Sequence, residues 1–334
     1  MIGVIILTFQ ADDVIEGCLN SLHASEYRDL RVVVCDNNSY DQTVPIVRQW
    51  AAANKIDLKE ALAQDEVAPA NQDSLTLIHT GSNLGFAGGV NVGLAHLLKD
   101  PAMNLFWILN PDTEVAPQTA GEFARCAERV GFFSLMGSRI QYREEPHLIQ
   151  SDGGSVNWWT GICSNINQGG QPEDAEFPDT GKLDFISGAN MVASREFVEQ
   201  AGPMVEDYFL YYEEVDWAQR RGNLPLAWCR DALVFHHGGT TIGSGAVNRR
   251  PSPFANYFNF RNRVRFMRQF RPLAVPVTWV TSMLRVVKLT ALGARAEAWA
   301  AFTGLNGLAP PTKISDRIAP DDRKLAFRPR DRSR

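Results

Sequence analysis

The chain has 334 residues, of which 45% are hydrophobic and 21% charged, an ordinary composition for a soluble globular protein. Its length allows one large domain with an appendage, or two modest domains. The five cysteines are scattered and odd in number, and they include no Cys-x-x-Cys pair. This pattern excludes a disulfide framework and a structural zinc site, and it fits a reducing compartment.

Short apolar segments rich in β-branched residues indicate the buried strands of a parallel sheet. We expect these strands at residues 2–7, 31–35, 74–79, 105–109 and 233–237. Apolar side chains at helical spacing predict helices at 14–22, 44–53 and 88–98. Residues 132–170 lack clear periodicity and predict short strands and loops. Strands that alternate with helices predict an α/β fold, a parallel sheet with helices on both faces.

The N-terminal segment and the hydropathy pattern bear on targeting. Residues 2–7 are apolar but have neither a basic flank nor a cleavage site, so we expect no signal peptide. The sequence contains no run of 18 apolar residues, so we also expect no clear membrane span.

Polar side chains follow three of the expected strands. Asp36, Asn83 and Asp112 each come after a strand end, where ligands bind in sheets of this kind. Asp112 ends the turn Asn110-Pro111-Asp112, and its carboxylate could hold a divalent cation together with diphosphate oxygens, because Mg²⁺ and Mn²⁺ prefer oxygen ligands. Taken alone, the same tripeptide is also a common turn.

Three carboxylates lie within four residues, directly after an aromatic run at 208–212. They belong to Glu213, Glu214 and Asp216. Like charges this close repel one another and are costly to bury, so a bound cation or a catalytic task would justify them. The alternative is the solvated, acidic first turn of a helix. The aromatic neighbours favour the wall of a cleft.

Two further segments carry ligand-binding chemistry. His236 and His237 end the last expected strand, and a neutral imidazole is a competent metal ligand, although a structural histidine is the alternative. The Gly-rich segment 83–93 leads into a helix N-terminus, which favours anions. It matches neither the dinucleotide-binding fingerprint nor a Walker P-loop.

Seven short runs, taken in order, resemble family 2 glycosyltransferases of the GT-A fold, and most of all the rhamnosyltransferase-like bacterial members that build cell-surface polysaccharide. Together they span about 240 residues, and their order is specific to the superfamily rather than to the sugar. The runs are VIILTF at 4–9, VCDNNS at 34–39, NLGFAGGVN at 83–91, LNPDT at 109–113, ISGANM at 186–191, FLYYEEVD at 209–216 and VFHHGGTT at 234–241.

The resemblance implies a GT-A catalytic domain over residues 1–245, a Rossmann-like and mostly parallel sheet with helices on both faces. It implies a nucleotide pocket lined by Thr8, Phe9, Asp36, Asn38, Asn83, Gly85, Phe86 and Asn110. It implies that Asp112 and His236 bind Mg²⁺ or Mn²⁺, with His237 as the second choice. Asn110 stands where the family has the first carboxylate of its Asp-x-Asp. The implied base is Glu214, with Glu213 and Asp216 as alternatives.

The resemblance implies an inverting, metal-dependent transferase of the hexosyltransferase class. It would move a sugar from a nucleotide diphosphate sugar to a hydroxyl of a glycan or lipid-linked acceptor in cell wall polysaccharide biosynthesis. A carboxylate would take the proton of the acceptor hydroxyl, and the cation would stabilise the departing diphosphate. dTDP-rhamnose is the expected donor, with UDP-galactofuranose and other UDP-sugars as alternatives.

Two other functions compete with sugar transfer. A nucleotidyltransferase also uses a nucleotide and a metal, but the segment after the first strand lacks its usual Gly-rich, basic signature. A non-catalytic nucleotide-sugar-binding protein would keep the fold without the chemistry. The residues expected to bind metal and to act as base argue against it.

The charge of the chain is unevenly distributed. Residues 246–334 hold 18 basic and 5 acidic residues, a net +13, whereas residues 1–245 hold 15 and 33, a net −18. Basic and apolar residues interleave over 260–295, which predicts a helical extension in peripheral contact with the cytoplasmic face of a membrane. The alternative is packing on the catalytic domain or on a second copy in a homo-oligomer. No nucleic-acid module is present, so we expect no nucleic-acid partner.

Overall fold

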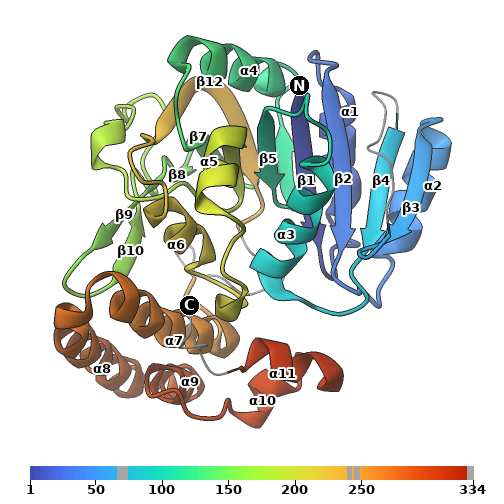
Figure 1. The fold of residues 1–334 in the computed structure, drawn as a ribbon. Coiled ribbons are helices and arrows are strands. Elements are labelled where there is room, and N and C mark those ends of the chain that lie inside the picture. Colours follow the sequence, from blue (N-terminus) through green and yellow to red (C-terminus); the bar gives the residue numbers. More distant parts are fainter. Residues whose placement is uncertain (66–73, 239–242, 244–248, 329–334) are drawn as a thin grey trace.

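The computed structural model describes residues 1–65, 74–238, 243 and 249–328 (Figure 1). Within these residues, ten strands form one sheet in the order β3-β4-β2-β1-β5-β11-β7-β12-β6, with β8 beside β7, and β9 pairs with β10. The strands are β1 Ile2–Thr8, β2 Leu30–Asp36, β3 Asp57–Leu62, β4 Ser74–His79, β5 Leu105–Leu109, β6 Thr113–Val115, β7 Leu135–Tyr142, β8 Ile149–Ser151, β9 Gly154–Asn157, β10 Ile162–Asn165, β11 Asn190–Ser194 and β12 Ala227–His236.

Helices cover the sheet and continue beyond it. Those of the N-terminal part are α1 Ile15–His23, α2 Thr43–Ala53, α3 Gly85–Leu97, α4 Thr119–Val130, α5 Arg195–Ala201 and α6 Glu213–Gln219. Those of the extension are α7 Pro253–Phe270, α8 Val275–Ala291, α9 Arg295–Leu305, α10 Thr312–Ser315 and α11 Arg323–Ala326.

The sheet is mostly parallel, as predicted. β3, β4, β2, β1 and β5 pair in parallel, so their carboxyl ends share one edge. β11 runs antiparallel between β5 and β7, and β12 pairs in parallel with β7 and antiparallel with β6. The polar residues that follow these strands therefore meet at one side of the domain.

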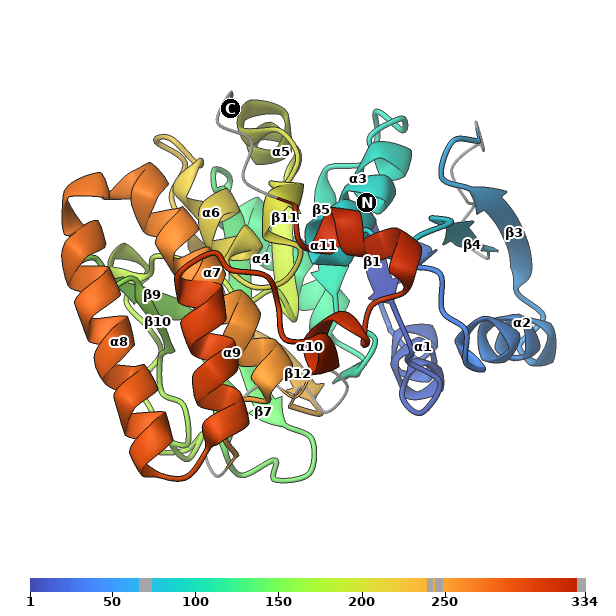
Figure 2. The same cartoon turned by 90° about the horizontal axis from the view of Figure 1, so that it is seen from below.

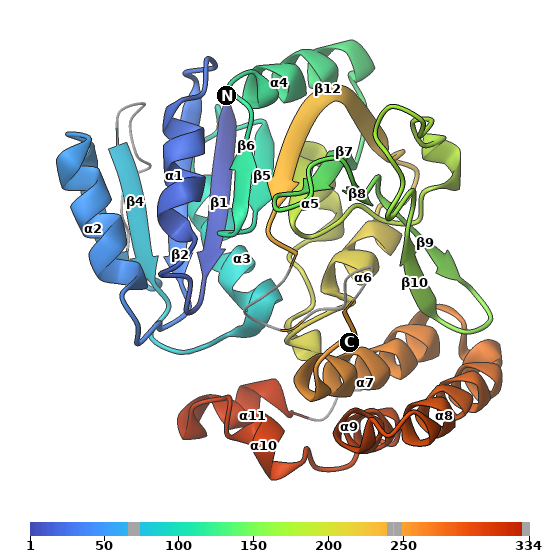
Figure 3. The same cartoon turned by 180° about the vertical axis from the view of Figure 1, so that it is seen from behind.

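Both faces of the sheet are buried, because successive residues of a strand point to opposite sides. Ile5 of β1 packs in one apolar cluster with Leu94 of α3, whereas its neighbours Val4 and Ile6 pack in another with Leu19 of α1. Helices α1 and α3 accordingly lie on opposite faces of the sheet (Figures 1 and 3). This arrangement explains the continuous apolar runs in the sequence.

The strands expected at 74–79 and 105–109 are confirmed at both ends, and those expected at 2–7 and 31–35 to within one residue at each end. Two further strands depart more from the expectation. β3 was not expected, because its sequence DLKEAL, at the exposed edge of the sheet, has neither a continuous apolar run nor a strict alternation of polar and apolar residues. β12 begins at Ala227 rather than at residue 233. A β-bulge between Cys229 and Leu233 carries the exposed Arg230 and Asp231, which interrupt the apolar pattern.

The C-terminal helices lie across the side of the sheet where the parallel strands end (Figures 1 and 2). Phe266 and Met267 of α7 share a core cluster with Trp217 of α6. Arg261 and Arg263, two of the basic residues expected to face a membrane, are each only 4% exposed. The structure thus corrects the expectation for α7, which packs on the catalytic domain. The domain boundary predicted at 245/246 lies outside the described residues.

Candidate active site

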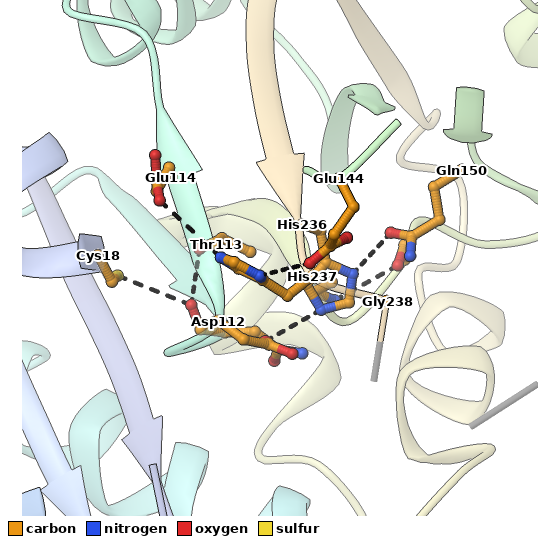
Figure 4. Close-up of polar contacts among 12 residues, drawn as sticks. Cys18, Asp112, Thr113, Glu114, Glu144, Gln150, His236, His237 and Gly238 are labelled. Atoms are coloured by element: carbon orange, nitrogen blue, oxygen red, sulfur yellow. Dashed lines mark hydrogen bonds and ion pairs between the residues drawn. The ribbon is translucent and has the colours of Figure 1, made fainter. Parts of the chain in front are cut away.

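Asp112 and His236 are brought together by strand pairing. β6 follows Asp112 directly and pairs with β12 so that Thr113 lies opposite His236. The Nε2 atom of His236 lies 3.0 Å from Oδ1 of Asp112, and the backbone N–H of His237 donates to the Asp112 carbonyl at 3.0 Å (Figure 4). Both side chains are buried. The sequence-predicted metal ligands are therefore neighbours, although they lie far apart in the chain.

Gln150 of β8 fixes the orientation of the His236 ring. Its Oε1 atom lies 2.6 Å from Nδ1 of His236, which leaves Nε2 directed at Asp112. His237 instead turns to Glu144, at 2.6 Å from Nδ1 to Oε1. The sequence offered no signal for Gln150, because it lies in the segment without clear periodicity. The structure places His236, and not His237, beside Asp112.

The pair fits a divalent cation in its donor chemistry. Burial disfavours the ionised Asp112, but the adjacent His236 outweighs this effect, so the pKa of the carboxyl lies below its ordinary value. One carboxylate oxygen and one imidazole nitrogen suit Mn²⁺ or Mg²⁺ when phosphate oxygens supply further ligands. Among the described residues, no group of three or more His, Cys, Asp or Glu side chains could hold a metal.

Glu213 and Glu214 open helix α6, where Glu213 is buried and Glu214 is partly buried. Burial raises the pKa of Glu214 to about 7, although backbone N–H groups of Tyr212, Glu214 and Val215 favour its ionised form. Burial and the adjacent Glu214 raise the pKa of Glu213 well above its ordinary value. The Oε2 atom of each has no hydrogen-bond partner within the described part of the chain. Such a carboxyl is suited to proton transfer near neutral pH.

Asp216 has a different environment. It is fully buried, and Tyr208 donates its hydroxyl proton to Oδ2 at 3.0 Å. The Nε atom of Arg220 lies 2.9 Å from Oδ1 and forms an ion pair with it. Both carboxylate oxygens of Asp216 therefore hold the start of α6 in place.

The predicted nucleotide residues cluster at the ends of β1 and β2. The hydroxyl of Thr8 donates to Oδ1 of Asp36 at 3.2 Å, and the backbone N–H of Ser39 donates to Oδ2 at 3.1 Å. Asn38 has a left-handed backbone with φ +64°. The ring of Phe9 packs edge-on against Tyr40, with centroids 6.3 Å apart and Tyr40 exposed.

Asn37 is a site residue that sequence reasoning missed. Its Nδ2 atom donates to the Gly85 carbonyl at 2.9 Å and lies 3.5 Å from Oδ1 of Asn83, which also accepts the Gly85 N–H at 3.0 Å. The buried Oδ1 of Asn37 has no partner among the described residues. The run of four polar residues at 36–39 was the only signal, and it did not separate Asn37 from its neighbours.

The Gly85–Phe86 segment touches the loop that carries the glutamates. The N–H of Phe86 donates to the Phe209 carbonyl at 2.8 Å. Gly85 has φ +74°, and a Cβ there would lie 2.4 Å from the same carbonyl oxygen, so the approach requires glycine.

Gly188 lies between the Phe86 side chain and Glu214. A Cβ at Gly188 would lie 3.3 Å from the Phe86 ring and 3.8 Å from Cβ of Glu214. The next residue, Ala189, accepts a backbone hydrogen bond from Asn110 at 3.0 Å. The segments that carry Phe86, Glu214 and Asn110 are therefore adjacent in the fold, although they are far apart in the sequence.

Comparisons with known proteins identify the family and the fold of the chain. A sequence profile described as Glycosyl transferase family 2 matches residues 3–202, more than half of the chain. The low-salt glycan biosynthesis hexosyltransferase Agl10 of Haloferax volcanii is 24% identical over 278 residues, 78% of this chain and 74% of that protein. The N-acetylglucosaminyl-diphospho-decaprenol L-rhamnosyltransferase of Mycobacterium tuberculosis is 24% identical over 265 residues, 73% of this chain and 78% of that protein.

A solved structure shares the fold. The mannosyltransferase PcManGT from Pyrobaculum calidifontis, in complex with GDP-Man and Mn²⁺, matches with a TM-score of 0.53 at 16% identity, over 91% of this chain and 86% of that one. The predicted GT-A fold is thus confirmed, and the sequence profile extends over the parallel half of the sheet and the Gly-rich segment. The chain belongs to glycosyl transferase family 2.

Proposed function

We propose that this nucleotide-sugar glycosyltransferase moves L-rhamnose from dTDP-rhamnose to a hydroxyl of a glycan or lipid-linked acceptor, with inversion and with Glu214 as the base. The observation that carries the proposal is the environment of Glu214. Its side chain combines a pKa of about 7, an unpartnered carboxylate oxygen and a place beside Phe86 and Gly188. Glu213 is 3% exposed, and both oxygens of Asp216 are engaged.

The proposed reaction has one chemical step. Glu214 accepts the proton of the acceptor hydroxyl while the oxygen attacks the anomeric carbon of the donor. The bond from that carbon to the diphosphate breaks as the new bond forms, and attack from the opposite face inverts the configuration. The nucleoside is held by the polar cluster at the ends of β1 and β2, where Thr8 and Ser39 orient Asp36.

Metal dependence is part of the proposal. Asp112 and His236 would hold Mg²⁺ or Mn²⁺, which stabilises the negative charge of a departing diphosphate. Asn110 replaces one expected carboxylate, so the substrate phosphates would contribute more of the ligands. The Mn²⁺ bound by PcManGT, a protein of the same fold, supports this assignment.

The donor and acceptor assignments rest on the relatives. The Mycobacterium tuberculosis protein is named for L-rhamnose and for a lipid diphosphate acceptor, and the Haloferax volcanii protein for a hexose. We therefore place the protein in the cytoplasm, at the cytoplasmic face of a membrane, where it would extend a lipid-linked glycan of the cell wall. UDP-galactofuranose and other UDP-sugars are the alternative donors.

A binding screen followed by a product assay tests the proposal. Thermal stability would be measured with dTDP-rhamnose, UDP-galactofuranose and other UDP-sugars, each with Mn²⁺ or Mg²⁺, and dTDP-rhamnose should raise the melting temperature most. Acceptor-dependent release of dTDP should follow. A larger shift with a UDP-sugar would overturn the rhamnose assignment. Release of pyrophosphate would indicate a nucleotidyltransferase, and binding without any release would indicate a binding protein.

A further inference from the structure

Helix α8 presents a row of apolar side chains to the outside. Its buried residues are Thr278, Ser282 and Val286, and Ala274 just before the helix is buried as well. The exposed residues spaced by three or four positions are apolar, namely Leu273, Val277, Val280, Leu284, Val287 and Ala291, which we call the outer stripe. A surface helix of a globular protein normally shows the opposite pattern. Removing the outer stripe from water, into an apolar environment, would therefore be favourable.

The stripe is long and prominent. Leu273 is 94% exposed and Leu284 64%. At 1.5 Å per residue the stripe extends about 27 Å along the helix. Helices α8 and α9 lie on the far side of α7 from the catalytic domain (Figures 2 and 3). Two tryptophans flank the stripe with partly exposed rings, Trp279 of α8 and Trp299 of α9. Tryptophan favours the boundary between lipid and water.

The basic residues around the outer stripe favour an anionic partner. Between Asp231 and Glu297 the sequence has no Asp or Glu. Exposed cations lie at both ends of the stripe, with Arg271 before it and Lys288 and Arg295 near its end. An anionic lipid surface would attract this face, while it would repel the acidic catalytic part of the chain. A second copy would instead bring two cationic faces together.

The hydrogen bonds on the buried face of α8 bear on whether this helix could cross a membrane. The stretch Pro272–Ala291 is long and apolar enough to cross a membrane by length and composition, contrary to the expectation that no clear span exists. However, Thr278 donates to the Trp159 carbonyl at 3.2 Å, and Nη1 of the buried Arg263 donates to Oγ of Ser282 at 3.3 Å. These contacts hold the first half of α8 against the protein, and Val286 packs in an apolar cluster with α7 and α9 further along the helix.

We propose that the outer stripe of α8 inserts into the surface of an anionic bilayer and lies in its plane, without crossing it. This inference rests on the proposed function in one respect only: a lipid-linked acceptor is presented at such a surface, which would explain why the protein binds there. The binding itself requires no sugar. The donor assignment and the membrane-binding proposal can therefore be disproved independently of each other.

Vesicle co-sedimentation of the full chain tests the proposal. The protein should sediment with vesicles that contain phosphatidylglycerol and much less with phosphatidylcholine alone, and added salt should weaken the binding. Val280→Asp combined with Leu284→Asp should reduce the bound fraction at least tenfold. The matched control is Ala52→Asp with Ala53→Asp, which adds the same charge to exposed positions of α2 and should bind as the unmodified protein does.

Further measurements test whether lost binding reflects lost folding, a dimer interface or a spanning helix. Circular dichroism and the thermal shift with nucleotide sugar should be equal for the α8 variant and the α2 control, so that lost binding is not lost folding. Equal binding by the α8 variant would overturn the proposal. A wild-type dimer that the α8 variant converts to a monomer, seen by sedimentation velocity without lipid, would assign the stripe to a second copy. Retention in vesicles after alkaline carbonate washing would indicate a spanning helix.

Discussion

The side-chain amide of Asn262 in α7 donates to the backbone carbonyl of Tyr208 at 2.9 Å, and the same Nδ2 atom lies within hydrogen-bond distance of the Leu210 and Tyr211 carbonyls. This loop precedes Glu213 and contains three non-glycine residues with left-handed backbone, with φ of +64°, +68° and +75° at Phe209, Tyr211 and Tyr212. Each costs on the order of 1 kcal/mol or more, so the surroundings must hold them. The C-terminal extension is therefore part of what positions the glutamates.

Replacing Asn262 should impair turnover more than donor binding. Asn262→Ala removes the donor to the Tyr208, Leu210 and Tyr211 carbonyls, and the loop would relax and displace Glu214. A displacement of about 1 Å can lower kcat on the order of 100-fold. The measurement is kcat and KM for the donor, with Asn259→Ala on the same helix as control. A change confined to the melting temperature would leave Asn262 with a purely structural role.

Glu214→Gln should remove the base and keep the shape of the site. We expect kcat to fall by roughly 100- to 10,000-fold while donor affinity stays within a few fold. Asp216→Asn should act on stability instead, because it weakens contacts with Tyr208 and Arg220. Steady-state kinetics and thermal denaturation separate the two effects. Full activity of Glu214→Gln would move the assignment to Glu213.

The pH dependence follows from the raised pKa of Glu214. Catalysis needs the ionised carboxylate, so kcat should rise with pH and level off above about 7. Stability should change in the opposite sense: between the ordinary pKa of 4.5 and about 7 the folded state binds the extra proton, so raising the pH through this window destabilises the fold. Melting temperatures of the protein and of Glu214→Gln should converge below about pH 4.5, separate progressively between pH 4.5 and about 7, and stay apart at higher pH, with the variant the more stable.

Gln150 should matter for metal binding although it is not an expected ligand. Gln150→Leu removes the contact to Nδ1 of His236 and frees the ring to rotate, which should weaken Mn²⁺ affinity by roughly 10- to 100-fold. His236→Ala should abolish the Mn²⁺-dependent thermal shift measured with donor present. His237→Ala is the matched control and should leave the shift unchanged, since its side chain turns to Glu144. Equal losses from both histidine variants would contradict the assignment.

The sequence by itself determined the architecture and indicated the residues of the candidate site. The buried strands were readable because both faces of the parallel sheet are covered, which leaves continuous apolar runs such as Leu105–Leu109. The sites that follow strand ends, including Asp36 and Asp112, were readable because parallel strands end at one edge. An edge strand with one exposed face, Asp57–Leu62, has no such run and was missed.

Only the tertiary structure decided which neighbouring side chains act together. It selected His236 over His237, engaged Asp216 in holding α6, and brought in Gln150 and Asn262 from segments with no motif. It also decided that Thr278 and Ser282 of α8 face the protein, whereas Leu284 and Val287 face outward. Periodicity gives a helix two faces but not their directions, and hydrogen-bond partners separated by 54 to 124 residues are fixed by packing alone.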